Sequence, residues 1–105
     1  MLLRAIAAIL LSLSAGAALG QAVGDPAAGY AYAVDFCADC HGVEPREAAS
    51  PEFLAPSFQM LANNPEISEL ALTAFFQTPH PSMPNFIVTG ENARDLIAYI
   101  DSLDR

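Results

Sequence analysis

Five consecutive residues, Cys37-Ala38-Asp39-Cys40-His41, hold both cysteines of the chain and one of its two histidines. Two thiols three positions apart can form thioether bonds to the vinyl groups on neighbouring rings of a porphyrin, and the next imidazole is then placed to bind iron. C-x-x-C-H is the attachment signature of a c-type haem. The sequence therefore predicts one covalently attached haem c, with Cys37 and Cys40 as the thioether residues and His41 as the proximal iron ligand.

Other uses of a C-x-x-C pair fit this chain less well. A thioredoxin-like redox pair needs a strand before it in a βαβ unit, and the sequence predicts no strand there. A structural zinc site normally has four ligands, whereas this chain adds only His41 and the distant His80 to its two cysteines. A simple disulfide would leave the adjoining histidine unexplained.

The first twenty residues have the pattern of a secretory signal peptide. Arg4 gives a positive start, residues 5–19 are a run of Ala, Leu and Ile with few interruptions, and small residues stand before position 21. A retained membrane anchor is the alternative, but about 15 apolar residues fall short of the roughly 20 needed to span a bilayer. We therefore expect residues 1–20 to be removed, leaving one domain over residues 21–105 in the periplasm of a bacterium, with no stable membrane insertion.

The charge of residues 21–105 is strongly negative. Three arginines and no lysine stand against twelve acidic residues, which gives a net charge of −9. Such a surface repels nucleic acid and anionic lipid, so neither is expected as a partner. The charge either attracts the basic docking patch of a redox partner protein or only keeps a small exported protein soluble.

Short helices joined by proline-rich loops are the expected architecture. Asp25-Pro26 caps a first helix that runs from Ala27 to Phe36. Residues 42–65 are loop-like, with one possible helical turn at 58–62. A second pattern predicts an amphipathic helix that begins at Asn64-Pro65 and ends before Pro79. Its apolar face is formed by these residues: Ile67, Leu70, Ala71, Ala74 and Phe75. The last helix follows Thr89 and has this apolar face: Ala93, Leu96, Ile97, Ile100 and Leu103. The predicted class is all-α.

From about residue 25 to residue 105 the chain resembles a class I c-type cytochrome. Gly29 stands eight residues before Cys37, where that family uses glycine so that its first and last helices can cross closely, and Tyr99 matches the aromatic of the last helix. Ala33 departs from the family, which often has an aromatic there; Tyr32 or Phe36 is expected to fill that space. The resemblance implies three to four short helices packed around one haem.

The resemblance also implies which residue binds iron on the second face. Met83 lies in Pro81-Ser82-Met83-Pro84, and similar Met-Pro loops carry the axial methionine in this family. Met60 is the other methionine of the domain, and ordinary core packing explains it. His80, three residues before Met83, is a competing ligand that would lower the haem potential.

A proline carbonyl is expected beside the proximal histidine. Ligating imidazoles nearly always donate their second N–H to an acceptor, and in the family a proline in the loop after the motif supplies it. Pro56 resembles that element, and Pro51 is an alternative. An apolar wall for the haem is expected from these residues: Phe53, Leu54, Phe58, Leu61, Phe75, Phe86 and Ile87.

Function follows from the site and the resemblance together. We expect no enzyme but an exported one-electron carrier that exchanges electrons with periplasmic redox partners through a His/Met-ligated haem. The alternative is a small cytochrome subunit of an oxidoreductase or dehydrogenase complex, and a third reading is a gas- or peroxide-reactive haem protein with an open sixth position. Because the domain is near the lower size limit for a self-supporting core, the haem-free chain is expected to be largely unfolded.

Overall fold

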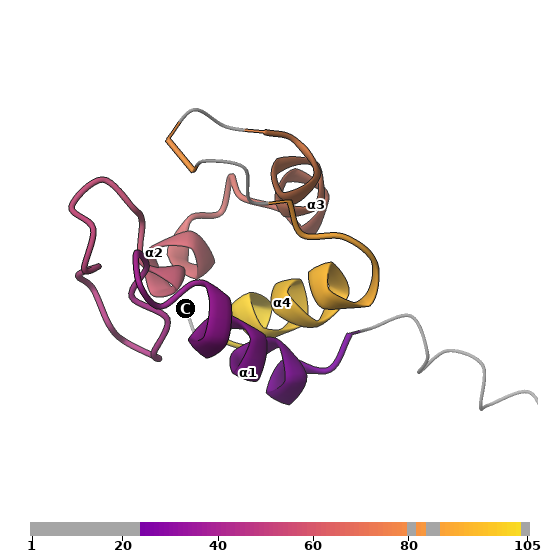
Figure 1. The fold of residues 1–105 in the computed structure, drawn as a ribbon, viewed down its shortest axis with the longest axis horizontal. Helices are drawn as coiled ribbons and strands as arrows, with labels where there is room; N and C mark the ends of the chain where they lie inside the picture. Colours follow the sequence, from indigo (N-terminus) through magenta and orange to yellow (C-terminus); the bar gives the residue numbers. More distant parts are fainter. Residues whose placement is uncertain (1–23, 80–81, 84–86, 104–105) are drawn as a thin grey trace, which may run out of the picture.

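The described part of the chain is helical. The computed structural model describes residues 24–79, 82–83 and 87–103, and within these residues it contains four helices and no β-strand (Figure 1). The helices are α1 (Pro26–Phe36), α2 (Phe58–Asn63), α3 (Glu69–Gln77) and α4 (Gly90–Ser102). The predicted all-α class is confirmed.

Helix α1 leads directly into the cysteine motif. Oδ1 of Asp25 accepts a hydrogen bond from the backbone N–H of Ala27 at 2.9 Å, and Pro26 occupies the first helical position, as predicted. The helix ends at Phe36, and the N–H of His41 then donates to the carbonyl of Cys37 at 2.9 Å. The motif is therefore a tight turn attached to the end of α1.

Helices α1 and α4 cross at Gly29. A Cβ atom at this position would lie 1.9 Å from the carbonyl oxygen of Asp95 and 2.9 Å from Cβ of Tyr99. Only glycine lets the two backbones come this close, so the close crossing predicted at Gly29 is confirmed. Figure 1 shows α1 and α4 side by side at the base of the fold.

An aspartate holds the same two helices together. Asp95 lies on α4 and is only 9% exposed. Its Oδ1 accepts a hydrogen bond from the backbone N–H of Asp25 at 2.8 Å, which ties the start of α1 to α4 across 70 positions of sequence. This carboxylate therefore contributes to the contact between α1 and α4 and does not lie on the solvent-facing side of α4.

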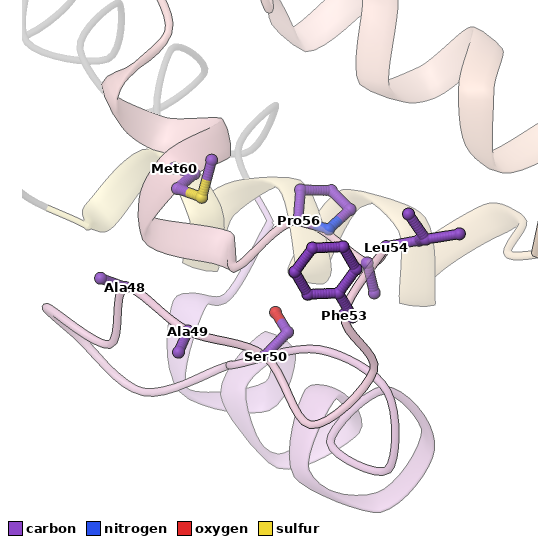
Figure 2. Close-up of a pocket in the computed structure, with 8 residues that line it drawn as sticks. Ala48, Ala49, Ser50, Phe53, Leu54, Pro56 and Met60 are labelled. Atoms are coloured by element: carbon purple, nitrogen blue, oxygen red, sulfur yellow. The ribbon is translucent and has the colours of Figure 1, made fainter.

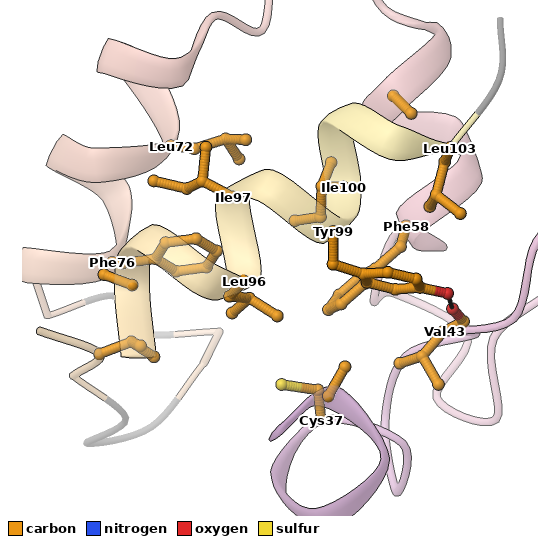
Figure 3. Close-up of a cluster of buried hydrophobic side chains, with 14 residues drawn as sticks. Cys37, Val43, Phe58, Leu72, Phe76, Leu96, Ile97, Tyr99, Ile100 and Leu103 are labelled. Carbon is orange, nitrogen blue, oxygen red and sulfur yellow. Dashed lines mark hydrogen bonds between the residues drawn. The ribbon is translucent and has the colours of Figure 1, made fainter. Parts of the chain in front are cut away.

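The apolar face predicted for α4 forms the centre of the core. All five predicted residues are buried, and Leu96 and Ile100 are almost completely enclosed. Side chains from the other helices pack against them, as Figure 3 shows for Leu72 and Phe76 of α3 and Phe58 of α2. The prediction for α4 is confirmed.

The predictions for α3 were wrong in start and in orientation. Ser68, not Asn64-Pro65, caps the helix, because its Oγ accepts from the N–H of Ala71 at 3.1 Å. The buried residues are Leu72 and Phe76, while Leu70 is 78% exposed. The segment carries apolar residues on two sides, so periodicity alone could not identify the side that packs on α4.

Helix α2 is a short element fixed by a buried cap. Oγ of Ser57, only 1% exposed, accepts from the N–H of Met60 at 3.1 Å. The predicted turn at 58–62 is confirmed and extends to Asn63. Met60 is 56% exposed, so its expected place in the core was wrong: it lies on the outer side of α2, whereas Phe58 and Ala62 take the inner side.

Among the described residues, none of the helices has the length and the apolar composition of a membrane-spanning segment. The signal peptide predicted over residues 1–20 lies outside those ranges.

Candidate haem site

The two cysteines of the motif differ in their surroundings. Cys37 is 7% exposed and packs in the core at the end of α1, whereas Cys40 is exposed, and both thiols are free. Burial, followed by the nearby Cys40, raises the pKa of the Cys37 thiol to about 11. The sulfur atoms therefore offer one attachment point inside the protein and one at its surface.

The imidazole of His41 is held in one orientation. Its Nδ1 lies 2.7 Å from the carbonyl oxygen of Pro56. A carbonyl can only accept, so Nδ1 carries the hydrogen and Nε2 keeps a free lone pair. Of the two prolines considered from the sequence, Pro56 makes this contact.

Aromatic side chains pack behind His41. The ring of Phe58 lies 5.5 Å from the imidazole and 6.4 Å from the ring of Tyr99. The Tyr99 hydroxyl donates a hydrogen bond to the carbonyl of Val43, two residues after His41 (Figure 3). Tyr99 thus anchors the segment that carries the imidazole. The sequence identified Tyr99 only as the aromatic residue of the last helix and did not reveal this second role.

Because Tyr99 can lose its proton, the stability of the protein is expected to depend on pH in the alkaline range. Burial, with smaller effects from Glu44, Tyr30 and Glu47, raises the pKa of Tyr99 to about 12 from its ordinary value of 10.0. Because the folded pKa is the higher one, the contribution of Tyr99 is complete below pH 10 and is lost as the pH rises to about 12. We expect the free energy of unfolding, measured by guanidinium denaturation and circular dichroism, to fall steeply across this window.

A Tyr99→Phe variant isolates this effect. At neutral pH it should be less stable by about 1 kcal/mol, since the hydrogen bond to Val43 is lost. Above pH 10 its stability should fall less steeply than that of the unmodified protein. Parallel curves for the two proteins would show that another group causes the alkaline loss.

Two of the three candidates for the second iron ligand lie in the described residues, on different elements of the fold. Met83 is half-buried in the loop between α3 and α4, and Met60 is exposed on α2. His80 lies outside the described residues, as does Phe86 of the expected apolar wall. Met83 is thus the better enclosed of the two methionines.

The available donors suit a haem better than a metal ion alone. No three His, Cys, Asp or Glu side chains gather as a metal site in the described part of the chain, which gives the zinc alternative no ligand set there. The polypeptide by itself also leaves large apolar side chains such as Phe36, Leu54 and Phe75 exposed. An apolar macrocycle with a central iron requires such a set of groups: two free thiols, one oriented imidazole and uncovered apolar surface.

Comparison with known proteins agrees with this donor set. The chain matches the family model described as Cytochrome c over residues 26–104. It is similar to cytochrome c-552 of Bradyrhizobium diazoefficiens, with 40% identity over 68 residues that cover 65% of this chain and 64% of the relative. No solved structure matches. Because the family match spans the four helices and the Cys37–His41 turn, the chain belongs to the cytochrome c family, whose members carry a covalently attached haem c.

Proposed function

We propose that the protein is an exported one-electron carrier whose haem iron is bound by His41 and Met83. The observation that carries the proposal is the hydrogen bond between Nδ1 of His41 and Pro56, because it leaves Nε2 as the ring nitrogen available to iron. The haem supplies the redox chemistry when bound. The chain holds it through Cys37 and Cys40 and orients the ligand.

Carrier function needs a site that changes oxidation state without binding a substrate. A thioether ligand favours ferrous iron and fills the position at which oxygen or peroxide would react. Met83 provides such a ligand from a half-buried loop position. In this proposal electrons enter and leave while no substrate bond is made or broken, so the protein is not an enzyme.

Export is the second part of the proposal. Residues 1–20 carry the signal-peptide pattern, and covalent haem attachment in bacteria takes place outside the cytoplasm. The mature protein is then a periplasmic domain that begins at Gln21. N-terminal sequencing of the coloured protein from a periplasmic extract tests this, and a mature protein that still begins at Met1 would contradict it.

The visible and near-infrared spectrum of the holoprotein tests the ligand assignment. We expect a thioether-bound haem that acid-acetone does not extract, and in the ferric state a near-infrared charge-transfer band from the methionine–iron bond. Rapid carbon monoxide binding by the native reduced protein would instead indicate an open sixth position.

Replacing the proposed sixth ligand should change the potential strongly. A Met83→Ala variant is expected to lose the near-infrared band and to bind carbon monoxide. Its midpoint potential should fall by on the order of 0.1–0.3 V, part of the roughly 0.8 V range that axial ligands cover. Met60→Ala is the matched control, since Met60 lies exposed on α2 and should leave spectrum and potential unchanged. A low-spin, six-coordinate Met83→Ala protein would transfer the assignment to His80.

A further inference from the structure

A surface recess lies between the loop that follows His41 and the first turn of α2 (Figure 2). It has a volume of about 380 Å³ and is lined by Ala48, Ala49, Ser50, Phe53, Leu54, Ala55, Pro56 and Met60. Phe53 is 93% exposed, and Figure 2 shows its ring in the middle of the recess while Leu54 points away. An exposed aromatic ring beside this recess gives a partner an apolar surface to contact.

The recess is formed in advance of any binding. Its loop is fixed by backbone N–H groups that donate from Gly42 to Oγ of Ser50 (2.9 Å), from Arg46 to Oε1 of Gln59 (2.8 Å) and from Glu52 to the carbonyl of Cys40 (3.1 Å). A partner that binds here does not have to order this loop, so little conformational entropy is lost.

The charges near the recess are mostly negative. The loop over residues 44–54 contains Glu44, Glu47 and Glu52 against one cation, Arg46, and Asp39 lies exposed within the motif. A second copy of this chain, with a net charge of −9 over residues 21–105, would be repelled. A basic protein surface would be attracted.

A covalent and hydrogen-bonded route joins the recess to the site of haem attachment. The exposed Cys40 is one of the two thioether positions, and its carbonyl oxygen accepts the hydrogen bond from the N–H of Glu52. The next residue is Phe53. A partner seated on Phe53 is therefore linked to the Cys40 sulfur through one short stretch of backbone and one hydrogen bond.

We propose that this recess, centred on Phe53, is the docking site for a redox partner that presents an apolar side chain surrounded by lysine or arginine. The inference rests on the proposed carrier function and adds to it where the partner binds and which residues it must carry. One electron passes between the reduced protein and the oxidised centre of the partner, and no proton or bond is transferred.

A small redox reagent with the same chemistry tests the site. Tris(1,10-phenanthroline)cobalt(III) is cationic and has aromatic ligands, and it accepts one electron to become cobalt(II). In stopped-flow oxidation of the reduced holoprotein at low ionic strength, the Glu52→Gln/Phe53→Ala variant should react about five-fold more slowly than the unmodified protein. The difference should shrink at high salt, where the charges are screened.

Two matched controls separate this site from general surface effects. Leu70→Ala removes an apolar side chain that is 78% exposed on α3, and Glu91→Gln removes an exposed carboxylate from the first turn of α4. Neither should change the rate with the cobalt reagent. Equal slowing by these controls, or no slowing by the Glu52→Gln/Phe53→Ala variant, would overturn the docking site.

Binding and redox measurements complete the test. Paramagnetic hexaamminechromium(III) should broaden amide resonances of residues 47–54, and broadening confined to other acidic residues would overturn the proposal. The sequence also suggested Phe53 for the apolar wall of the haem, and the midpoint potential of the Phe53→Ala variant separates the two roles. An unchanged potential supports the docking site, whereas a changed potential would mean that Phe53 covers the haem and would overturn it. Reversible oxidation by anionic hexacyanoferrate(III) tests the carrier function separately, because it needs no basic surface on the oxidant.

Discussion

A Cys37→Ala/Cys40→Ala variant is expected to lose its haem and most of its helical structure. The variant, produced in a host with cytochrome maturation, should emerge from the periplasm colourless or release all colour into acid-acetone. Its far-ultraviolet circular dichroism should lack more than half of the helical signal of the holoprotein, and its thermal unfolding should show no cooperative transition.

The physical reason is that the polypeptide alone does not bury enough apolar surface. Its helices have 11, 6, 9 and 13 residues, and isolated helices shorter than about 12–15 residues are marginal in water. Several large apolar side chains remain exposed in the chain itself, Phe36 and Phe75 among them. A covalently bound macrocycle supplies the apolar surface that the chain lacks, as metals and disulfides do for other small domains.

The single substitutions provide the control. Cys37→Ala and Cys40→Ala each leave one thiol that can still form a thioether, so each protein should keep colour that acid-acetone does not remove. Both should retain helix, with the larger loss of stability in Cys37→Ala, because this residue is buried and Cys40 is exposed. A colourless double variant with native circular dichroism and cooperative unfolding would show that the fold does not need the haem.

Elements that depend on neighbouring residues could be predicted from the sequence. The cap at Asp25 and the proline after it act within two residues, and helix α1 begins where they predict. Helix α4 has one apolar face and one polar face, so its buried side was also predictable. The site at Cys37–His41 was predictable because the spacing of its two cysteines and its histidine is the haem-attachment motif.

Elements that depend on distant partners could not be predicted in this way. Helix α3 offers two apolar sides, and only its contact with α4 decides that Leu72 and Phe76 are buried. The sequence alone does not indicate that Asp95 is buried, because its partner, the backbone N–H of Asp25, lies far away in the chain. The hydrogen bond from Tyr99 to Val43 likewise joins residues 56 positions apart. Periodicity describes one element at a time and contains no information on these pairs.

Gly29→Ala is expected to destabilise the holoprotein, although alanine is the better helix former. In the interior of a helix, alanine in place of glycine favours folding by about 1 kcal/mol. Here the added methyl would lie 1.9 Å from a backbone oxygen of α4, so the two helices would have to move apart. Overpacking of this kind costs about 1–3 kcal/mol and more when backbone must shift, and we expect a net loss of about 2 kcal/mol.

The sign of the change decides between the two effects. Guanidinium unfolding of the ferric holoprotein, followed by circular dichroism, should give a lower midpoint for Gly29→Ala with an unchanged slope. Ala28→Leu is the matched control: it adds more volume at the neighbouring exposed position of α1 and should change stability by less than about 0.5 kcal/mol. A Gly29→Ala protein more stable than the unmodified one would mean that helix propensity outweighs the contact, and that α1 and α4 have room to separate. Since α1 leads into the turn that begins at Cys37 and α4 carries Tyr99, a forced separation should also displace the segment that contains His41 and Val43. The midpoint potential of Gly29→Ala should therefore change together with its stability.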